Sequence, residues 1–192
     1  MTGKSPNKTP ANHPSRARRI LRWAERVFAV IGLCFVIYHL GFELTVMTSG
    51  SMAPALQGTS YSNGDRILVE KITGRFRTPK RWEIYFLYDA EGTPVAKRIV
   101  GLPGERVSIK GTNLYINGVE TRPPSRLQSL NYYPLGNLAR GREVDCGKDY
   151  FVLGDDSKDS YYSRYLGPVT SSQLRGRAWC ILWPFSRVGF VN

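Results

Sequence analysis

The distribution of apolar and polar positions divides the chain into a short N-terminal part and a long C-terminal part. Residues 27–44, VFAVIGLCFVIYHLGFEL, are mostly apolar and are interrupted by His39 and Glu43 near one end. A helix of this length would reach about 27 Å, close to the ~30 Å of a bilayer's hydrocarbon core. The pattern predicts a transmembrane helix over residues 27–44, preceded by a basic tail over residues 1–26.

After residue 60, short runs of β-branched and aromatic residues alternate with Gly, Pro, Asn or Asp, which is typical of a sheet protein with tight connections. The expected strands are 66–72, 83–88, 95–101, 106–110, 113–118, 149–154, 176–182 and 187–191. The KGTN sequence at 110–113 has hairpin character. Residues 121–148 are rich in Pro and Gly and predict a loop-rich insertion. We therefore expect residues 45–192 to form one mainly β domain.

Positive charge precedes the apolar segment and continues, without a basic block, through the rest of the chain. Residues 1–44 carry seven Lys or Arg and two Glu, a net charge of +5, which leaves +7 of the total +12 for residues 45–192. Nucleic-acid-binding surfaces usually gather basic residues on one element. Scattered charge suits anionic lipid headgroups, so we expect a lipid bilayer as partner and no nucleic acid. The positive-inside rule places the N-terminus in the cytoplasm and the β domain on the outer side of the plasma (inner) membrane.

A cleavable signal peptide is the alternative interpretation of the apolar segment. The basic region before it is unusually long for a signal peptide, and no Ala-x-Ala-like site follows it. An uncleaved, single-pass anchor is therefore favoured. The Pro, Ser and Asn content of the tail predicts disorder before the anchor.

Of the three cysteines, Cys34 lies in the apolar segment, and Cys146 and Cys180 lie in the outer part. Export permits a disulfide between the latter two, but two unpaired thiols are an equal possibility, since sequence does not fix their geometry. No cluster of Cys and His residues occurs, so we expect no metal site.

The segment TSGSMAPAL, at 48–56, follows the apolar run closely. Ser-Gly-Ser is common turn chemistry, so one interpretation is a polar turn. The other is a nucleophilic Ser51 held at the membrane surface. A serine hydroxyl needs a base to remove its proton, and the only histidines are His13 in the tail and His39 in the apolar segment. A Ser-His-Asp triad is thereby excluded, and a buried, neutral lysine is the remaining option.

Lys97, in PVAKRIVGLPGE, is the best candidate for that base. In a strand, Val95, Lys97 and Ile99 share one face, while Arg98 points to the other. Apolar neighbours disfavour an ammonium ion, and bringing a lysine pKa from ~10.4 to near 7 costs about 4–5 kcal/mol. Arg98 cannot serve, because a guanidinium does not deprotonate usefully. The alternative is that Lys97 snorkels from a strand edge.

Four motifs carry a resemblance to a known family: SGSMAPAL (49–56), GDRILVEK (64–71), KRIVGLPGE (97–105) and GDDSKDSYYSRYLGPV (154–169). In this order they resemble the motifs of type I signal peptidases, which are membrane-anchored serine proteases with a Ser/Lys dyad. The similarity covers most of residues 45–110 and 150–192. It implies a signal-peptidase/LexA-like β catalytic domain, preceded by one N-terminal transmembrane helix.

The resemblance also implies roles for individual residues. Ser51 matches the family's nucleophile, and Lys97 matches its general base. Ser49 matches the serine whose hydroxyl joins the N–H of Ser51 in the oxyanion hole. Ser160 matches the serine that hydrogen-bonds the lysine.

Asp155 and Arg164 match a supporting Asp and Arg of the family, but the sequence departs from the family pattern beside them. Asp156 stands in place of the usual Asn, and Tyr162 stands in place of the Asp that pairs with the arginine. Arg164 must therefore find another partner, with Asp155 and Asp156 as the candidates. The family also favours Thr where this chain has Ala55.

The activity implied by the resemblance is that of signal peptidase I, an endopeptidase that needs no cofactor and removes N-terminal signal peptides from exported preproteins at the outer face of the membrane. Substrates would carry small residues, typically Ala-x-Ala, before the cut, and would pair as a strand with an exposed sheet edge. Trp183 and Phe185 would either contact lipid or pack in the core.

Three other functions are compatible with parts of the sequence. A conjugative-transfer peptidase, which matures pilin subunits, would use the same dyad and anchor. A catalytically inactive, membrane-tethered β module would be expected to lack Ser51 or Lys97, and both are present. Self-cleaving repressors of the LexA type share the dyad chemistry but bind DNA and need no anchor.

Overall fold

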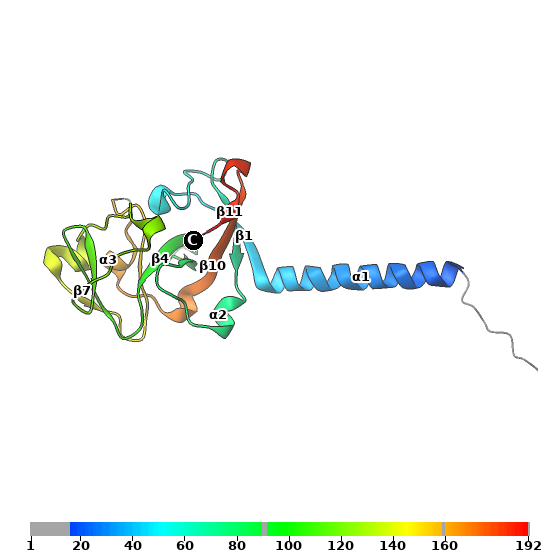
Figure 1. The fold of residues 1–192 in the computed structure, drawn as a ribbon, viewed down its shortest axis with the longest axis horizontal. Helices are drawn as coiled ribbons and strands as arrows, with labels where there is room; N and C mark the ends of the chain where they lie inside the picture. Colours follow the sequence, from blue (N-terminus) through cyan, green and yellow to red (C-terminus); the bar gives the residue numbers. More distant parts are fainter. Residues whose placement is uncertain (1–15, 90–91, 159, 192) are drawn as a thin grey trace, which may run out of the picture. The chain divides into compact units, whose positions relative to one another are not determined.

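The computed structural model describes residues 16–89, 92–158 and 160–191 (Figure 1). The chain divides into two compact units, Met1–His39 and Leu40–Asn192. The described part of the first unit is helical, and all the strands formed by the described residues lie in the second unit. The prediction of a mainly β domain is thus confirmed.

Helix α1 spans Arg16–Gly41. It begins eleven residues before the predicted start at Val27 and ends three residues before the predicted end at Leu44. Residues 16–26 are helical where disorder was expected, and residues 1–15 lie outside the described residues. Within the described ranges, no helix combines the length and the apolar character needed to cross a membrane.

The helix ends at Gly41 because the next residues are recruited into a sheet. The N–H of Lys71 donates to the carbonyl of Gly41 at 2.8 Å, and a Cβ at Gly41 would lie 2.5 Å from the Ile72 side chain. Strand β1, Phe42–Val46, then pairs antiparallel with strand β2, Arg66–Glu70. Tertiary pairing therefore decides the conformation of residues 42–44, which local hydropathy had assigned to the helix.

The large sheet contains seven antiparallel strands in the order β1-β2-β10-β3-β4-β9, with β11 paired to β10. The other strands are β3 (Ile84–Tyr88), β4 (Pro94–Gly101), β9 (Phe151–Leu153), β10 (Leu174–Trp183) and β11 (Gly189–Phe190). Alternate residues of β3 pack into different clusters. Ile84 and Phe86 join one core with Met52, whereas Tyr85 and Leu87 join another with Ile99. The sheet is therefore buried on both faces around β3 and β4.

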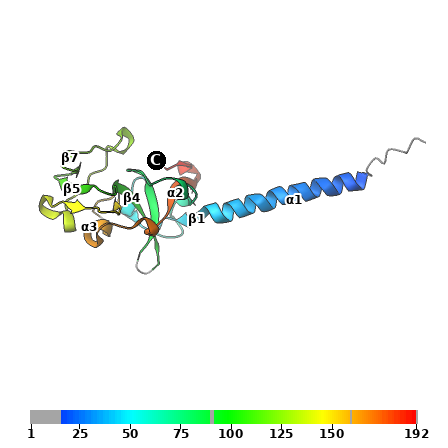
Figure 2. The ribbon, with the colours of Figure 1, turned by 90° about the horizontal axis from the view of Figure 1, so that it is seen from below.

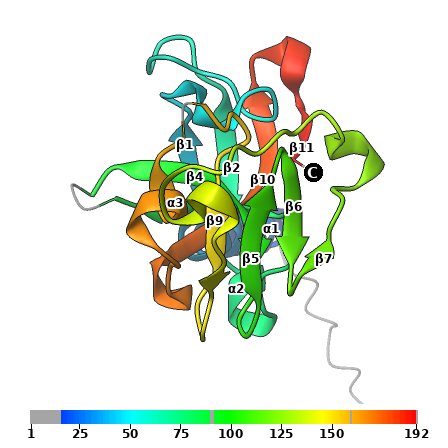
Figure 3. The same cartoon turned by 90° about the vertical axis from the view of Figure 1, so that its left-hand side faces the viewer.

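A second sheet has the order β7-β6-β5-β8 and lies beside the end of the large sheet that carries β4 and β9 (Figures 2 and 3). Its strands are β5 (Arg106–Lys110), β6 (Asn113–Ile116), β7 (Val119–Glu120) and β8 (Val144–Asp145). Lys110 pairs with Asn113 across a tight turn, in which Gly111 has a φ of +63°. This is the hairpin predicted from KGTN. Side chains from both sheets share one core, including Val107, Ile109 and Phe151.

All eight predicted strands occur, with ends shifted by a few residues, and β1, β7 and β8 were not predicted. The short helices are α2 (Thr73–Phe76) and α3 (Tyr162–Leu166), and the 3₁₀ turns are η1 (Gly50–Met52), η2 (Ser125–Leu127), η3 (Gly136–Gly141), η4 (Ser171–Gln173) and η5 (Phe185–Arg187). The insertion at 121–148 contains η2, η3 and β8, and it buries Leu127, Leu130 and Leu138 against the second sheet.

The three cysteines are free thiols. Cys146 is buried in the core between the sheets, and burial raises its pKa to about 11. Cys180 lies on β10, opposite Phe190 of β11. The structure therefore selects unpaired thiols from the two possibilities that the sequence left open.

Candidate active site

The turn that carries Ser51 is held by core residues that follow it. Ser51 lies in η1, where the N–H of Ala53 donates to the carbonyl of Gly50 at 2.9 Å. Met52 and Leu56 are completely buried in the core under β2 and β3. Their burial fixes the turn, so that the Ser51 hydroxyl has one defined position rather than that of a mobile surface loop.

Lys97 lies in the middle of β4 and reaches that hydroxyl. Its Nζ donates to the Oγ of Ser51 at 2.8 Å. Each side chain is only 5 % exposed, so Lys97 does not snorkel from an edge. Val95 and Ile99, its neighbours on the same strand face, both belong to the apolar cluster around Leu87 and Val152. The predicted pair of a serine and a buried lysine is thus brought together from positions 46 residues apart.

Ser49 also lies beside the nucleophile, with its Oγ 3.2 Å from the Oγ of Ser51. Position 49 has an extended backbone, with φ −137° and ψ 155°, and the chain turns only after it. The two hydroxyls therefore face one another from either side of Gly50. A hydroxyl in this position can donate to an oxygen bound next to Ser51.

The loop after β9 brings Ser160 against the same turn. Ser160 Oγ accepts a hydrogen bond from the N–H of Gly154 at 2.9 Å. The N–H of Asp156 donates to the carbonyl of Ser51 at 3.1 Å. A Cβ at Gly154 would lie 2.4 Å from both the carbonyl oxygen of Ser51 and Ser160 Oγ. Gly154 is therefore a site residue that the sequence analysis did not single out, although it opens the GDDSKDS motif.

Asp155 pairs with Arg98, and not with Arg164. The Nε and Nη2 of Arg98 donate to the two carboxylate oxygens of Asp155 at 2.7 and 2.6 Å, and both side chains are fully buried. Burial raises the pKa of Asp155, and the Arg98 guanidinium opposes that rise. The Nη1 of Arg98 also donates to the carbonyl of Trp82 at 2.6 Å. This ion pair joins β4 to the loop that carries Ser160.

Arg164 is held by serine and backbone oxygens. Its Nη1 donates to Ser157 Oγ at 2.9 Å, and its Nη2 donates to the carbonyls of Ser157, at 2.5 Å, and of Ser160. Burial lowers the pKa of Arg164. Ser157 Oγ also accepts a hydrogen bond from the N–H of Tyr133 at 2.8 Å. Neither carboxylate expected as a partner of Arg164 is bonded to it: Asp155 is held by Arg98, and Asp156 acts on Arg164 only as a nearby charge.

Arg98 and Ser157 were not predicted to support the site. A signal for Arg98 was present in the sequence, because it lies between Ala96 and Val100 on one strand face. A guanidinium between apolar residues is stable only with an anionic or strongly accepting partner. No comparable signal identifies Ser157, whose role depends on how the loop folds.

A cleft of about 470 Å³ is lined by residues that shortly precede the dyad residues in the sequence, together with Tyr61 and Arg66: Leu44, Thr45, Val46, Thr48, Thr93 and Pro94. Part of the lining comes from β1 and the residues after it, up to Thr48, which immediately precedes Ser49. Another part comes from Thr93 and from Pro94 at the start of β4, three residues before Lys97. Figure 3 shows β1, β4 and α3 on the same side of the second unit. The segments that lead to the two dyad residues thus both line this cleft.

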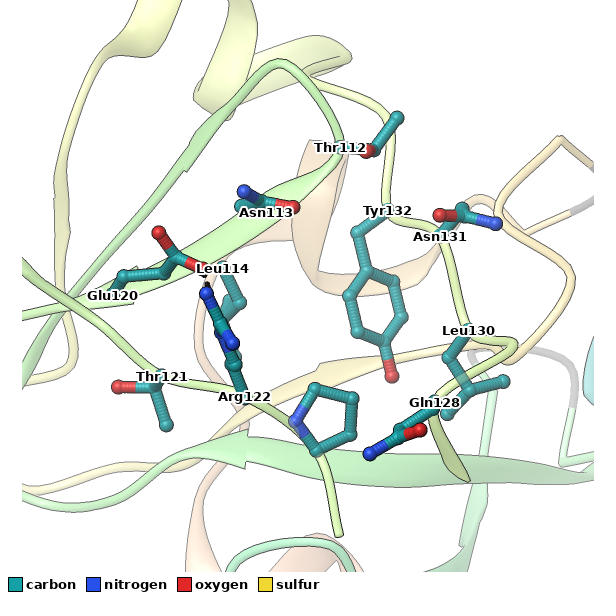
Figure 4. Close-up of a pocket in the computed structure, with 11 residues that line it drawn as sticks. Thr112, Asn113, Leu114, Glu120, Thr121, Arg122, Gln128, Leu130, Asn131 and Tyr132 are labelled. Carbon is teal, nitrogen blue, oxygen red and sulfur yellow. Dashed lines mark hydrogen bonds and ion pairs between the residues drawn. The ribbon is translucent and has the colours of Figure 1, made fainter. Parts of the chain in front are cut away.

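Another cavity, of about 370 Å³, lies on the second sheet and the start of the insertion (Figure 4). Figure 4 shows the ring of Tyr132 between the Asn131 and Gln128 side chains. The two charged residues of its lining, Glu120 and Arg122, pair with each other at 3.1 Å. None of the predicted site residues lines it. Its side chains offer no nucleophile paired with a base.

Comparison with known proteins identifies the family of the chain from its sequence. A family model described as "Signal peptidase, peptidase S26" matches residues 20–183. A probable signal peptidase I-2 from Synechocystis sp. is 34 % identical over 158 residues, which cover 78 % of this chain and 67 % of the relative. Signal peptidase I P from Bacillus subtilis subsp. natto is 33 % identical over 180 residues, which cover 88 % of this chain and 91 % of the relative.

Among solved structures, a signal peptidase I from Enterococcus faecalis V583 aligns with a TM-score of 0.42 and 34 % identity, over 53 % of this chain and 97 % of that chain. The assignment rests on the sequence matches, which extend over most of the chain at more than 30 % identity. The chain belongs to the signal peptidase family, peptidase S26.

Proposed function

We propose that this chain is a signal peptidase I, a serine endopeptidase that removes N-terminal signal peptides from exported preproteins at the outer face of the plasma membrane. The observation that carries the proposal is the buried contact of 2.8 Å between Lys97 Nζ and Ser51 Oγ. A serine next to a buried amine and without a histidine is an activated nucleophile of the Ser/Lys type. The two relatives described above are both named as signal peptidases.

In the proposed mechanism Lys97 begins in its neutral form and accepts the proton of Ser51 as that oxygen attacks the carbonyl carbon of the scissile bond. The Ser49 hydroxyl and the Ser51 N–H donate to the oxygen that becomes negative. Protonated Lys97 then gives the proton to the leaving amine, which frees the mature chain. A water that loses its proton to the same lysine hydrolyses the acyl ester.

Ser160 and the Arg98–Asp155 pair act as positioning residues in this proposal. Ser160 packs against Gly154, on the side where Gly154 faces the carbonyl of Ser51. The ion pair fixes the loop that carries Ser160 to the strand that carries Lys97. A shift of either element would separate the amine from the hydroxyl, and catalysis by positioned groups is lost when they move by even about 1 Å.

The cleft between β1 and β4 is the proposed binding site for the residues before the cut. Strand β9 pairs only with Arg98–Gly101 of β4, and β1 ends the sheet order. Among the described strands, the outer edge of β1 and the first half of β4 therefore lack a neighbour on the cleft side. An extended peptide can supply that neighbour through backbone hydrogen bonds, and alternate side chains then point into the cleft.

We also propose that the chain is attached to the membrane by the apolar part of α1, residues 27–41, with the N-terminus in the cytoplasm. The apolar side chains of α1 are exposed, among them Phe28, Ile31 and Phe35. Arg22 and Arg26 precede them on the same helix. An apolar segment behind a basic one supports this orientation.

The exposed aromatic pair at the end of β10 supports a second contact with lipid. Trp183 is 43 % exposed and Phe185 is 79 % exposed, with their ring centroids 4.6 Å apart. Both residues could have packed in the core, and neither does. Large aromatic groups that remain exposed to solvent suit the interface of a bilayer.

The test uses detergent-solubilised protein and a panel of labelled preproteins, with the cuts mapped by mass spectrometry. Ser51→Ala and Lys97→Ala should each abolish cleavage, whereas Ser129→Ala and Lys148→Ala, which change exposed residues of the same types, should not. Substantial cleavage by a folded Ser51→Ala or Lys97→Ala protein would refute the dyad. Cleavage of pilin precursors alone would favour the conjugative-transfer peptidase.

A further inference from the structure

Tyr162 occupies a position next to the active-site loop where the family resemblance leads one to expect an aspartate. Its ring packs against the apolar cluster that contains Leu87 and Ile99. Its hydroxyl donates to the carbonyl of Tyr88 at 3.2 Å. The side chain therefore links α3, which follows the Ser160 loop, to the end of β3.

The carbonyl of Tyr88 needs such a donor because β10 no longer pairs with β3 at this residue, although Tyr88 still pairs with Pro94 of β4. The pairing of β3 with β10 ends at Leu87 and Leu174, so Tyr88 lies one residue beyond that ladder. Its ring is held separately, with the Arg175 guanidinium 4.4 Å from the ring centroid. Tyr162 and Arg175 together fix the residue from which the chain leaves β3.

This residue leads directly to one wall of the cleft beside the dyad. Tyr88 pairs with Pro94 of β4, and the N–H of Asp89 donates to the carbonyl of Thr93 at 3.0 Å. The N–H of Thr93 donates to Asp89 Oδ1 at 2.7 Å. Thr93 and Pro94 then line the cleft. A displacement of Tyr88 would therefore move the wall, while Lys97 is held three residues further on by β3 and by Ser51.

We propose that Tyr162 is a specificity-determining positioning residue, whose hydroxyl fixes the Thr93–Pro94 wall and thereby limits the size of the substrate side chain accepted before the cut. The inference rests on the proposed function, because it concerns the selectivity of that same reaction. It requires a phenol that keeps its proton and remains a donor. Burial raises the pKa of Tyr162, and the charge of Asp89 raises it further.

The experiment compares Tyr162→Phe with Tyr165→Phe in the detergent-solubilised full chain. The first variant removes the hydroxyl and leaves the ring in the apolar cluster. The second makes the same change on the same short helix, at a residue whose ring stacks on Tyr161 with centroids 4.2 Å apart. Steady-state kinetics are measured on two forms of one preprotein, with Ala or Val immediately before the cut, and thermal melts are recorded for each protein.

The loss of one neutral hydrogen bond should raise KM for the Ala substrate about three- to tenfold and change kcat less than about twofold. The preference for Ala over Val, as the ratio of kcat/KM values, should fall by a similar factor, and Tyr165→Phe should match the wild type. Equal KM and equal preference in Tyr162→Phe and Tyr165→Phe would overturn the inference. So would a lower kcat with unchanged KM, which would indicate a role in the chemical steps, or the loss of a cooperative melt.

These outcomes differ from a failure of the proposed function. If the wild type cleaves neither substrate nor any other preprotein, the proposed function fails. If the wild type cleaves them and Tyr162→Phe is unchanged, only the role of Tyr162 fails.

Discussion

Gly154 shows how closely the active-site loop approaches the nucleophile. The carbonyl oxygen of Ser51 and the Oγ of Ser160 both occupy the space that a side chain at position 154 would take. No other residue type can hold the two serines in these places, because any Cβ would force the loop away from the turn. The glycine is needed for the close approach of two segments that are about a hundred residues apart.

We predict that Gly154→Ala lowers kcat/KM by about a hundredfold or more, because displacements of about 1 Å at a catalytic group have effects of this size. The matched control is Gly74→Ala, since a Cβ at Gly74 meets nothing within 4 Å and the residue lies in a helix. Both variants are assayed on one preprotein. Full activity of Gly154→Ala would mean that the loop does not position the nucleophile.

The pairing of Ser51 with Lys97 leads to a prediction about how the rate of cleavage depends on pH. A lysine that accepts the serine proton must be neutral, so kcat/KM should rise with pH along a limb that follows loss of the proton from Lys97. Measurements between about pH 5 and 10 cover the range in which a perturbed lysine would titrate. The proposed base would have to be abandoned if the profile were flat over that range.

At the level of single residues, sequence could identify the chemistry but only part of its support. Ser51 and Lys97 could be identified from the sequence because their motifs are specific and no histidine of the chain could serve as the base. The partner of Asp155 could not be identified, because it depends on which arginine faces the loop after folding. Arg98 and Arg164 are both buried, and only the three-dimensional arrangement shows that the carboxylate goes to the first.

The ion pair of Arg98 and Asp155 is fully buried, and it joins strand β4 to the loop that begins at Gly154. Removing one partner of such a pair leaves a charge in a low-dielectric interior, which costs about 3–5 kcal/mol. The exposed pair of Arg106 and Asp145, with side chains 64 % and 62 % exposed, provides the contrast.

We therefore predict that Asp155→Ala destabilises the protein by about 3–5 kcal/mol, whereas Asp145→Ala costs less than about 1 kcal/mol. Denaturant unfolding of both variants measures the difference. Activity should fall with the first change and persist with the second. Similar stabilities for the two variants would show that Arg98 finds other acceptors.

In the proposed binding mode, the residues of β1 and β4 that line the cleft set the substrate preference. The cleft has a volume of about 470 Å³, so the space for a side chain before the cut is limited. We predict that replacing the first Ala before the cut with Phe or Leu blocks processing, and that Ser or Gly is tolerated. Gel assays on a series of preprotein variants measure how much of each variant is cleaved. Efficient cleavage after bulky residues would mean a protease of different specificity.

At the scale of elements, the alternation of apolar and polar residues was sufficient to find the strands that build the sheets. It failed for β1, because Phe42–Val46 continues the apolar run of α1 without a turn residue that could mark a boundary other than Gly41. It also failed for β7 and β8, which have two residues each and are too short for any period. The arrangement of the strands, which forms the cleft, depends on contacts distant in sequence.

For the molecule as a whole, the proposed attachment to the membrane makes a prediction about topology. If residues 27–41 insert with the N-terminus inside, protease added to spheroplasts should digest the chain after residue 45 and spare an N-terminal epitope. Permeabilised cells, in which both parts become accessible, provide the control. Digestion of the epitope in intact spheroplasts, with the remainder protected, would reverse the proposed orientation.

The open edges beside the dyad have a consequence for turnover. If the substrate binds as a strand between β1 and β4, its affinity comes mainly from backbone hydrogen bonds to residues before the cut, and hydrolysis leaves these bonds intact. The mature protein can depart, but the released signal peptide keeps the contacts that bound the preprotein. We expect the cleaved leader to remain as a competitive inhibitor, so that its removal by lipid or by other proteases controls how soon the next preprotein enters.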